Sequence, residues 1–257
     1  MVKRIRIFGV WGQNKYPHFI CYIIVLHHKI FHAEKENAPY LTLVHGAGGS
    51  SSIWHKQIRT FKEHFNVLVI DLRGHGMSKF SLKSDHIEKY SFEFIANDVI
   101  KVLDHLKIEK THFAGISLGT IIMRQISEMR PDLVDSMVMG GAIIEFNFRS
   151  KLLIHFGNLF KYVLPYMILY KLFAFIIMPR DKHKESRNLF IEEAKKVYQK
   201  EFLKWFRLTW GINKLLTIFR TTDSGKPTLY IMGEEDYMFL PAVKYLISKH
   251  EKSSLLV

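Results

Sequence analysis

Short apolar runs alternate with amphipathic segments from residue 40 onward, and this alternation sets the predicted architecture. Runs rich in β-branched residues predict buried strands, and apolar residues recurring every three to four positions predict helices. Such alternation favours right-handed crossovers, so we expect an α/β fold with a mostly parallel, twisted sheet flanked by helices. The expected strands cover residues 40–45, 66–70, 111–116 and 134–139, and the expected helices cover residues 52–64, 91–107 and 118–129.

The two ends of the chain also carry strand signals. Residues 17–33 are apolar and β-rich, which favours an antiparallel hairpin at the sheet edge. Near the other end, Pro227–Met232 predicts a strand and Pro241–His250 a helix that opens on a proline. Ser253–Val257 predicts one further strand.

Residues 143–222 interrupt the alternation with a long helical pattern. Polar residues break its apolar runs before they reach the length of a membrane span. We expect a helical cap inserted between two strands, which divides the α/β core into residues 1–142 and 223–257. Its aromatic residues form either the apolar roof of a substrate pocket or the cap's own core: Phe156, Phe160, Tyr166, Phe173 and Trp205.

The composition is that of an ordinary globular domain. The chain has 257 residues, of which 48% are hydrophobic and 24% charged, enough for one full hydrophobic core. Its single cysteine, Cys21, allows no intrachain disulfide and favours a reducing compartment. The apolar stretch that follows Arg6 is too short for a secretory signal. These features predict a cytoplasmic protein without a targeting or membrane-spanning segment.

The net charge of +13 is concentrated in the predicted cap. Residues 146–222 hold 15 Lys and Arg against 5 Asp and Glu, whereas residues 1–145 hold 18 against 14. A solvated basic surface is the simplest interpretation, and the alternatives are attraction of anionic substrates or peripheral contact with an anionic membrane surface. No recognised nucleic-acid-binding module accompanies the charge, so nucleic acid is not an expected partner.

The segment Gly115–Gly119, with the sequence GISLG, carries the candidate nucleophile. It lies between a predicted strand and a predicted helix, where a tight turn would expose the hydroxyl of Ser117. Glycines two positions before and after the serine are needed because side chains there would clash in so sharp a turn. This pattern alone is moderately specific, and two upstream segments strengthen it.

The first upstream segment is a strand that runs into the glycine-rich loop after His45, and the second is a strand that ends in Asp71–Ser78. Together, His45-Gly46 with Trp54, then Asp71–Ser78, then Gly115–Gly119, resemble the α/β-hydrolase family in order and spacing. The resemblance covers residues 40–257 and is to the serine esterase and lipase-like members that carry a helical cap.

The resemblance implies a set of site residues. Ser117 would be the nucleophile, and an oxyanion hole would form from the N–H of Leu118 and an N–H of the loop that begins at Gly46. The loop donor is Ala47, with Gly48 as the alternative. His45 and His75 are expected to brace loops rather than to react.

The acid of the triad is expected to follow the nucleophile in chain order. Asp236 lies three residues after Gly233, just past the end of a predicted strand, and the resemblance favours it over Glu234 and Glu235. No metal-ligand cluster is visible, and the chemistry requires no cofactor. The expected substrate is a small hydrophobic carboxylic ester or thioester, and the charge of the cap would suit an anionic one.

The catalytic histidine poses a problem, because His250 is the only histidine after Asp236. A helix from Pro241 to His250 runs back from the active-site edge by roughly 15 Å, since each residue rises ~1.5 Å. The family's histidine loop follows the last strand, so we expect a C-terminally truncated hydrolase whose histidine lies beyond Val257. The alternatives are a catalytically inactive binding protein, a base borrowed from elsewhere such as His45, or a C–C bond hydrolase of the same fold.

Overall fold

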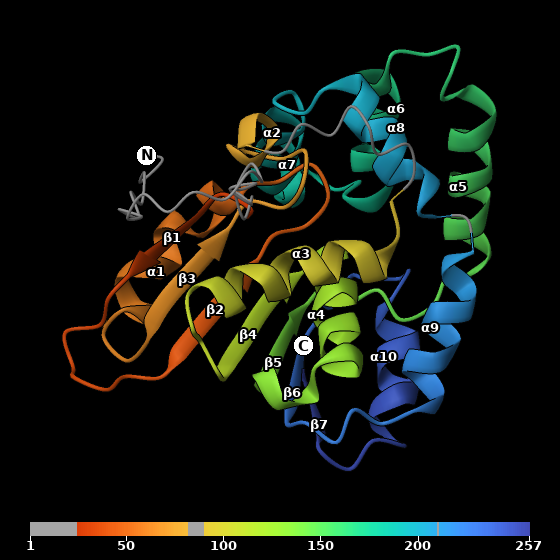
Figure 1. Ribbon diagram of the computed structural model, residues 1–257. Helices are drawn as coiled ribbons and strands as arrows, with labels where there is room; N and C mark the ends of the chain where they lie inside the picture. Colours follow the sequence, from red (N-terminus) through yellow and green to blue (C-terminus); the bar gives the residue numbers. More distant parts are fainter. Residues whose placement is uncertain (1–24, 82–89, 210) are drawn as a thin grey trace, which may run out of the picture.

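The computed structural model describes residues 25–81, 90–209 and 211–257. Within these ranges a seven-stranded sheet has the order β1-β3-β2-β4-β5-β6-β7 (Figure 1). β1 pairs antiparallel with β3 at one edge, and the other neighbouring strands pair in parallel. The strands are β1 (His28–Phe31), β2 (Tyr40–Val44), β3 (Asn66–Ile70), β4 (Thr111–Ile116), β5 (Val134–Gly140), β6 (Thr228–Ile231) and β7 (Ser253–Leu256).

Parallel pairing brings the carboxyl ends of the central strands to one edge of the sheet. Val44, which ends β2, lies opposite Ile70 of β3 and Gly115 of β4. Ile116, which ends β4, lies opposite Gly140 of β5. The loops that follow these strands therefore emerge side by side, at the edge where open α/β sheets bind their ligands.

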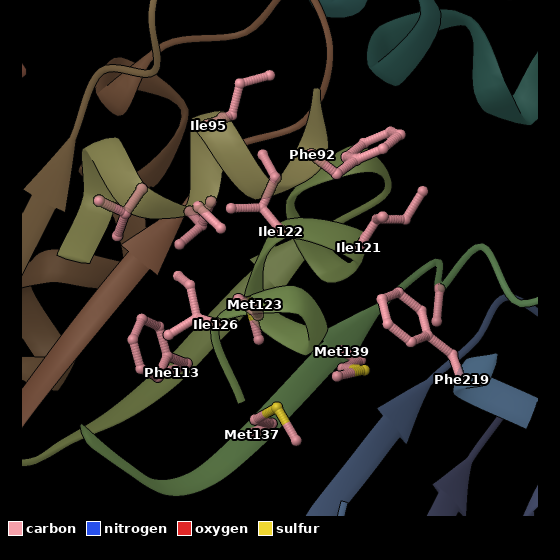
Figure 2. Packing of buried hydrophobic residues seen from close by; sticks show 14 of the residues in the cluster. Phe92, Ile95, Phe113, Ile121, Ile122, Met123, Ile126, Met137, Met139 and Phe219 are labelled. Atoms are coloured by element: carbon pink, nitrogen blue, oxygen red, sulfur yellow. The ribbon is translucent and has the colours of Figure 1, made fainter. Parts of the chain in front are cut away.

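The sheet is buried on both faces, as its unbroken apolar strands predict. On one face, Figure 2 shows Ile126 of α4 beside Phe113 of β4, and both side chains belong to the larger hydrophobic cluster. On the other face, Leu43 and Trp54 belong to a second cluster. The helices around the sheet are α1 (His55–Phe61), α2 (Ser78–Ser81), α3 (Phe92–His105), α4 (Leu118–Met129) and α10 (Leu240–Ile247), with 3-10 turns η1 (Ser51–Trp54) and η3 (Pro131–Leu133).

Local sequence explains where α3 begins and which side it buries. The Ser91 side chain accepts a hydrogen bond from the Phe94 N–H at 3.0 Å, which caps the helix. Ile95, Val99 and Leu103 recur every four residues and are fully buried, so one side of the helix faces the sheet.

Between β5 and β6 the chain forms a run of helices that we call the helical insertion (residues 148–221). It accounts for the break in the strand and helix alternation. Its helices are α5 (Phe148–Phe160), α6 (Tyr166–Ile177), α7 (Lys184–Ala194), α8 (Gln199–Arg207) and α9 (Ile212–Thr221), with the 3-10 turn η4 (Asp181–His183). Nothing in the helices of the described ranges is both long and apolar enough to cross a membrane.

The sequence-based elements agree with this arrangement, with two differences. The helix expected over residues 52–64 is a 3-10 turn followed by the shorter α1. The edge strand of the expected N-terminal hairpin is present as β1, but its partner is β3, which lies far along the chain. The earlier part of that hairpin lies outside the described residues. The division into a core and a cap stays a prediction.

Close packing of α4 against β2 generates the first test. A Cβ added to Gly119 would lie 2.5 Å from the Val44 carbonyl oxygen and 2.9 Å from that of His45. Because these are backbone atoms of the sheet edge, we expect Gly119→Ala to lower the free energy of unfolding by about 1–3 kcal/mol. Urea unfolding would measure this loss. The matched control is Gly233→Ala, since no atom lies within 4 Å of that added Cβ. Equal midpoints for the two variants would contradict the packing argument.

Candidate active site

Ser117 lies in the turn between β4 and α4 with a strained backbone. Its φ is 52° and its ψ is −120°, a conformation that a residue with a side chain rarely adopts. The Ser117 N–H donates to the Gly140 carbonyl at 2.9 Å. The Thr120 N–H and hydroxyl both donate to the Ser117 carbonyl, at 2.9 and 2.6 Å. This strand-turn-helix geometry is that of a nucleophile elbow.

The glycines of the elbow are required by close contacts. A Cβ on Gly115 would lie 2.4 Å from the Met123 sulfur and 3.0 Å from the Val44 carbonyl oxygen. Gly119 is similarly confined against the end of β2. The two glycines let the turn fit between the end of β2 and the body of α4, as the sequence pattern predicts.

The loop after β2 lies against the elbow. A Cβ on Gly46 would lie 3.3 Å from both the Ile116 carbonyl oxygen and the Ser117 Cβ. The Gly48 N–H donates to Nε2 of His75 at 3.0 Å, so it is not free to serve as the alternative oxyanion donor. Among the described contacts, the N–H groups of Ala47 and Leu118 have no hydrogen-bond acceptor. The loop therefore offers Ala47, and not Gly48, as the partner of Leu118.

Two buried histidines fix the shape of this loop. Nδ1 of His45 donates to the Gly46 carbonyl at 2.7 Å, and Nε2 accepts from the Leu72 N–H at 3.0 Å. His75 has the same pattern, with Nδ1 3.0 Å from the Arg73 carbonyl oxygen and Nε2 on Gly48. Both ring nitrogens of each histidine are thus engaged with backbone, which argues against His45 as a borrowed base.

Burial keeps these rings neutral. It lowers the pKa of His45, and it lowers the pKa of His75 to about 3, with the neighbouring His45 adding to the effect. The ring centroids of the two histidines lie 5.1 Å apart. Two charged imidazoles at that distance in a buried site would repel strongly, so the loop depends on both staying unprotonated.

Asp71 is a further organising residue, and the sequence analysis gave it no role of its own. Its carboxylate accepts the Ser51 N–H at 2.7 Å and the Met77 N–H at 2.9 Å. Burial opposes ionisation of Asp71, but these amides outweigh it and lower the pKa of the carboxyl. A Cβ on Gly76 would lie 2.3 Å from this carboxylate. In the sequence, the signal for this role was an aspartate that directly follows a buried strand and precedes a glycine-rich turn.

The helical insertion contacts both loops, which no sequence pattern indicated. The Tyr170 hydroxyl of α6 donates to the Ala47 carbonyl at 2.7 Å, and burial raises the Tyr170 pKa far enough to keep that proton. Ser50 donates to Glu193 of α7 at 3.0 Å. Nε1 of Trp205 in α8 donates to the Arg73 carbonyl at 3.0 Å. These contacts hold the insertion against the loops that follow β2 and β3.

The aromatic residues expected to roof a pocket make their described contacts within the protein. Trp205 packs edge-on against His75 with ring centroids 5.0 Å apart. The other four stack on aromatic neighbours of the insertion: Phe156 on Phe160, Tyr166 on Phe202, and Phe173 on Phe206. Trp205 is buried whereas Phe156 is exposed, so the choice between a pocket roof and the cap's own core stays a prediction.

Asp236 follows β6 at the carboxyl edge of the sheet. One carboxylate oxygen, Oδ1, accepts the N–H groups of Met238 and Phe239 at 3.0 and 2.8 Å. These bonds hold the carboxylate at the start of the segment that leads into α10. The neighbouring Glu235 instead ion-pairs with Arg180 and other cations of the insertion, so its carboxylate is engaged in these contacts.

His250 lies at the opposite edge of the sheet. It precedes Ser253, which pairs with Thr228 at the amino end of β6, and its Nε2 is 3.3 Å from the Arg220 carbonyl oxygen. This position agrees with the argument from helix length. Across the described ranges no histidine hydrogen-bonds to Ser117, and no cluster of three metal-ligating side chains occurs. The base expected beyond Val257 is not tested by these residues and stays a prediction.

The fold and the elbow define an α/β-hydrolase-type architecture. A family model described as the alpha/beta hydrolase fold matches residues 39–257, and the chain belongs to this family. A hydrolase from Pseudomonas aeruginosa has a similar solved structure, with a TM-score of 0.74 at 19% identity, covering 89% of this chain and 84% of that one. At that identity the likeness shows the fold alone.

Two curated relatives match in part. The chain is 33% identical over 138 residues to RutD of Pseudomonas savastanoi pv. phaseolicola, which is named for carbamate hydrolysis; the match covers 51% of this chain and 52% of RutD. It is 38% identical over 84 residues to 3-oxoadipate enol-lactonase 1 of Acinetobacter baylyi, covering 33% of this chain and 29% of that protein. The chain thus spans about half, or less, of the length of these relatives.

Protonation of His75 generates the second test. Its pKa is about 3 in the folded state and 6.5 in an unfolded chain, so between these values the unfolded chain binds more protons. Stability is therefore retained above pH 6.5 and falls as the pH drops below it, by up to about 1.4 kcal/mol per pH unit. Between pH 6.5 and 4.5, the free energy of unfolding measured with urea should fall less steeply with decreasing pH in His75→Gln than in the unmodified chain. The difference in slope should correspond to about one proton.

The control for this test is His64→Gln, because His64 is exposed and should leave the pH dependence unchanged. Glutamine can still accept the Gly48 N–H, so the variant removes the titration while keeping an acceptor. An unchanged slope in His75→Gln would mean that His75 is not the buried neutral group described.

Proposed function

We propose that this protein is a serine hydrolase that cleaves a carboxylic ester or thioester through an acyl-enzyme. Ser117 is the nucleophile, Asp236 is the acid that orients the base, and the N–H groups of Ala47 and Leu118 form the oxyanion hole. The observation that supports the proposal is the strained backbone of Ser117 in the turn between β4 and α4, with Gly46 of the loop packed against it. No cofactor or metal takes part.

The proposed reaction has two half-reactions. Ser117 Oγ bonds to the carbonyl carbon while its proton passes to the base, and the negative charge on the carbonyl oxygen is stabilised by the two amides. The C–O or C–S bond then breaks and the leaving group takes the proton. Water attacks the acyl-enzyme in the same way, releasing the acid and restoring the Ser117 hydroxyl.

The base is the open part of the proposal. His45 and His75 are neutral but have both ring nitrogens engaged with backbone, and His250 lies at the other edge of the sheet. We propose that the base is a histidine outside the described residues, as the family resemblance implies for the segment after Val257. A binding protein that keeps the elbow without turnover is the competing hypothesis.

The proposed substrate class follows from the helical insertion and the relatives. The insertion supplies apolar and aromatic side chains together with most of the net positive charge, which favours a hydrophobic acyl group and suits an anionic one. RutD and the enol-lactonase are named for carbamate and lactone substrates, which share a carbonyl bonded to a heteroatom. This favours C–O or C–S cleavage over the C–C bond alternative.

Covalent labelling tests the nucleophile. Ser117→Ala should abolish labelling by a fluorophosphonate probe, because the probe reacts only with an exposed, activated serine. The matched control is Ser248→Ala, which removes an equally small hydroxyl from an exposed position after α10 and should leave labelling unchanged. Labelling that survives in Ser117→Ala would overturn the assignment.

Chemical rescue tests the base. No histidine of the described residues hydrogen-bonds to Ser117, and general-base assistance is worth ~10²–10⁴-fold. Added imidazole should raise the rate of fluorophosphonate labelling at least about tenfold, because it supplies part of that assistance. Ser117→Ala with imidazole gives the background. Labelling that is fast and insensitive to imidazole would show that the chain already contains the base.

A further inference from the structure

The outward side of α5 carries an apolar stripe. Its members lie four, four, three and four positions apart, which places them along one side of a helix and its continuation. They are between 36% and 80% exposed, although large apolar side chains of a surface helix normally face the core. The stripe consists of Phe148, Leu152, Phe156, Leu159 and Val163.

The opposite side of α5 is the one that packs. Ser150 and Gly157 are buried. A Cβ on Gly157 would lie 2.7 Å from Phe173 of α6 and 2.5 Å from Phe206 of α8. α5 is therefore fixed to the insertion through small residues and packs Ile154 against the core, whereas the side chains of the stripe face away. Figure 1 shows α5 along the outer margin of the insertion.

Within residues 146–180 the charged residues have a single sign, and the preceding Glu145 ion-pairs with Arg220. Residues 146–180 contain five Lys and Arg and no Asp or Glu. Arg149 and Lys151 are exposed on α5 itself, and neither has an ion-pair partner among the described residues. A surface that combines exposed apolar side chains with unpaired cations fits a partner that offers both hydrocarbon and anionic groups.

We propose that the α5 stripe is a docking surface for an anionic lipid bilayer. The helix lies in the plane of the interface, with Leu152, Phe156 and Leu159 at the boundary of the acyl chains and with Arg149 and Lys151 at the phosphates. This is binding on the membrane, not across it, consistent with the absence of a helix in the described ranges that could span one. Docking through α5 does not depend on the proposed catalytic function.

A second copy of the chain fits this surface less well. A two-fold contact between two stripes would bring Arg149 and Lys151 of one copy towards the same cations of the other. No carboxylate in residues 146–180 is available to pair with them. Like charges across an interface oppose association, whereas lipid phosphates would neutralise them.

Vesicle co-sedimentation tests the proposal with the full chain. We expect binding to phosphatidylglycerol-containing vesicles to be at least about tenfold tighter than to phosphatidylcholine alone, since each cation near an anionic surface contributes about fivefold. Added salt should weaken the binding. The Ser117→Ala variant should bind equally, so loss of catalysis and loss of docking are separable.

Two sets of variants locate the surface. The double variant Leu159→Glu and Val163→Glu should weaken binding by at least about tenfold, and Arg149→Gln with Lys151→Gln should remove most of the preference for anionic lipid. The control for each added glutamate is Tyr245→Glu on α10, which is 59% exposed against 65% for Leu159 and adds one negative charge elsewhere. All altered side chains are exposed, and an unchanged urea midpoint would verify folding.

Three results would overturn the proposal. The first is equal binding to anionic and neutral vesicles, or none to either. The second is a double variant that binds as tightly as the unmodified chain. The third is a dimer in light scattering that the double variant converts to monomers, which would assign the stripe to a second copy.

Discussion

The close approach of the elbow to the end of β2 is the constraint on which the site depends. The backbone of Ser117 is held at a positive φ because α4 begins directly against the last carbonyls of β2. That approach is open only to residues without a Cβ at Gly115 and Gly119. It also brings Gly46 against Ser117, so one packing contact sets both the direction of the hydroxyl and the position of the loop amides.

The polar interior around this contact is built so that almost no net charge is buried in the loops themselves. The two imidazoles act as neutral connectors between backbone groups, and the Asp71 carboxylate accepts the N–H groups of Ser51 and Met77 and lies 3.1 Å from Nδ1 of His27. The Arg73 guanidinium is matched by both oxygens of Asp98, at 2.7 and 3.0 Å. Satisfying each group in this way keeps the loop in one conformation, which preorganised amides require.

The sequence was sufficient for the strands, the order of the elements and the elbow, because each rests on local patterns. Residues 41–44 and 67–70 are short buried runs in which Thr42 is the one polar residue, and Gly115–Gly119 carries its steric requirement in its own spacing. The contact between Tyr170 and Ala47 was not predictable, since it joins residues 123 positions apart without any periodicity. The engagement of the Gly48 N–H was also not predictable, because it depends on the orientation of one peptide group towards Nε2 of His75.

Glu235, which lies beside the proposed acid, joins the helical insertion to the segment after β6 through ion pairs. Arg180, Lys182 and His183 of the insertion all converge on this one carboxylate, and contact with Lys182 lowers its pKa. Asp236 is its immediate neighbour. These ion pairs hold residues 180–183 of the insertion beside the segment that carries Asp236.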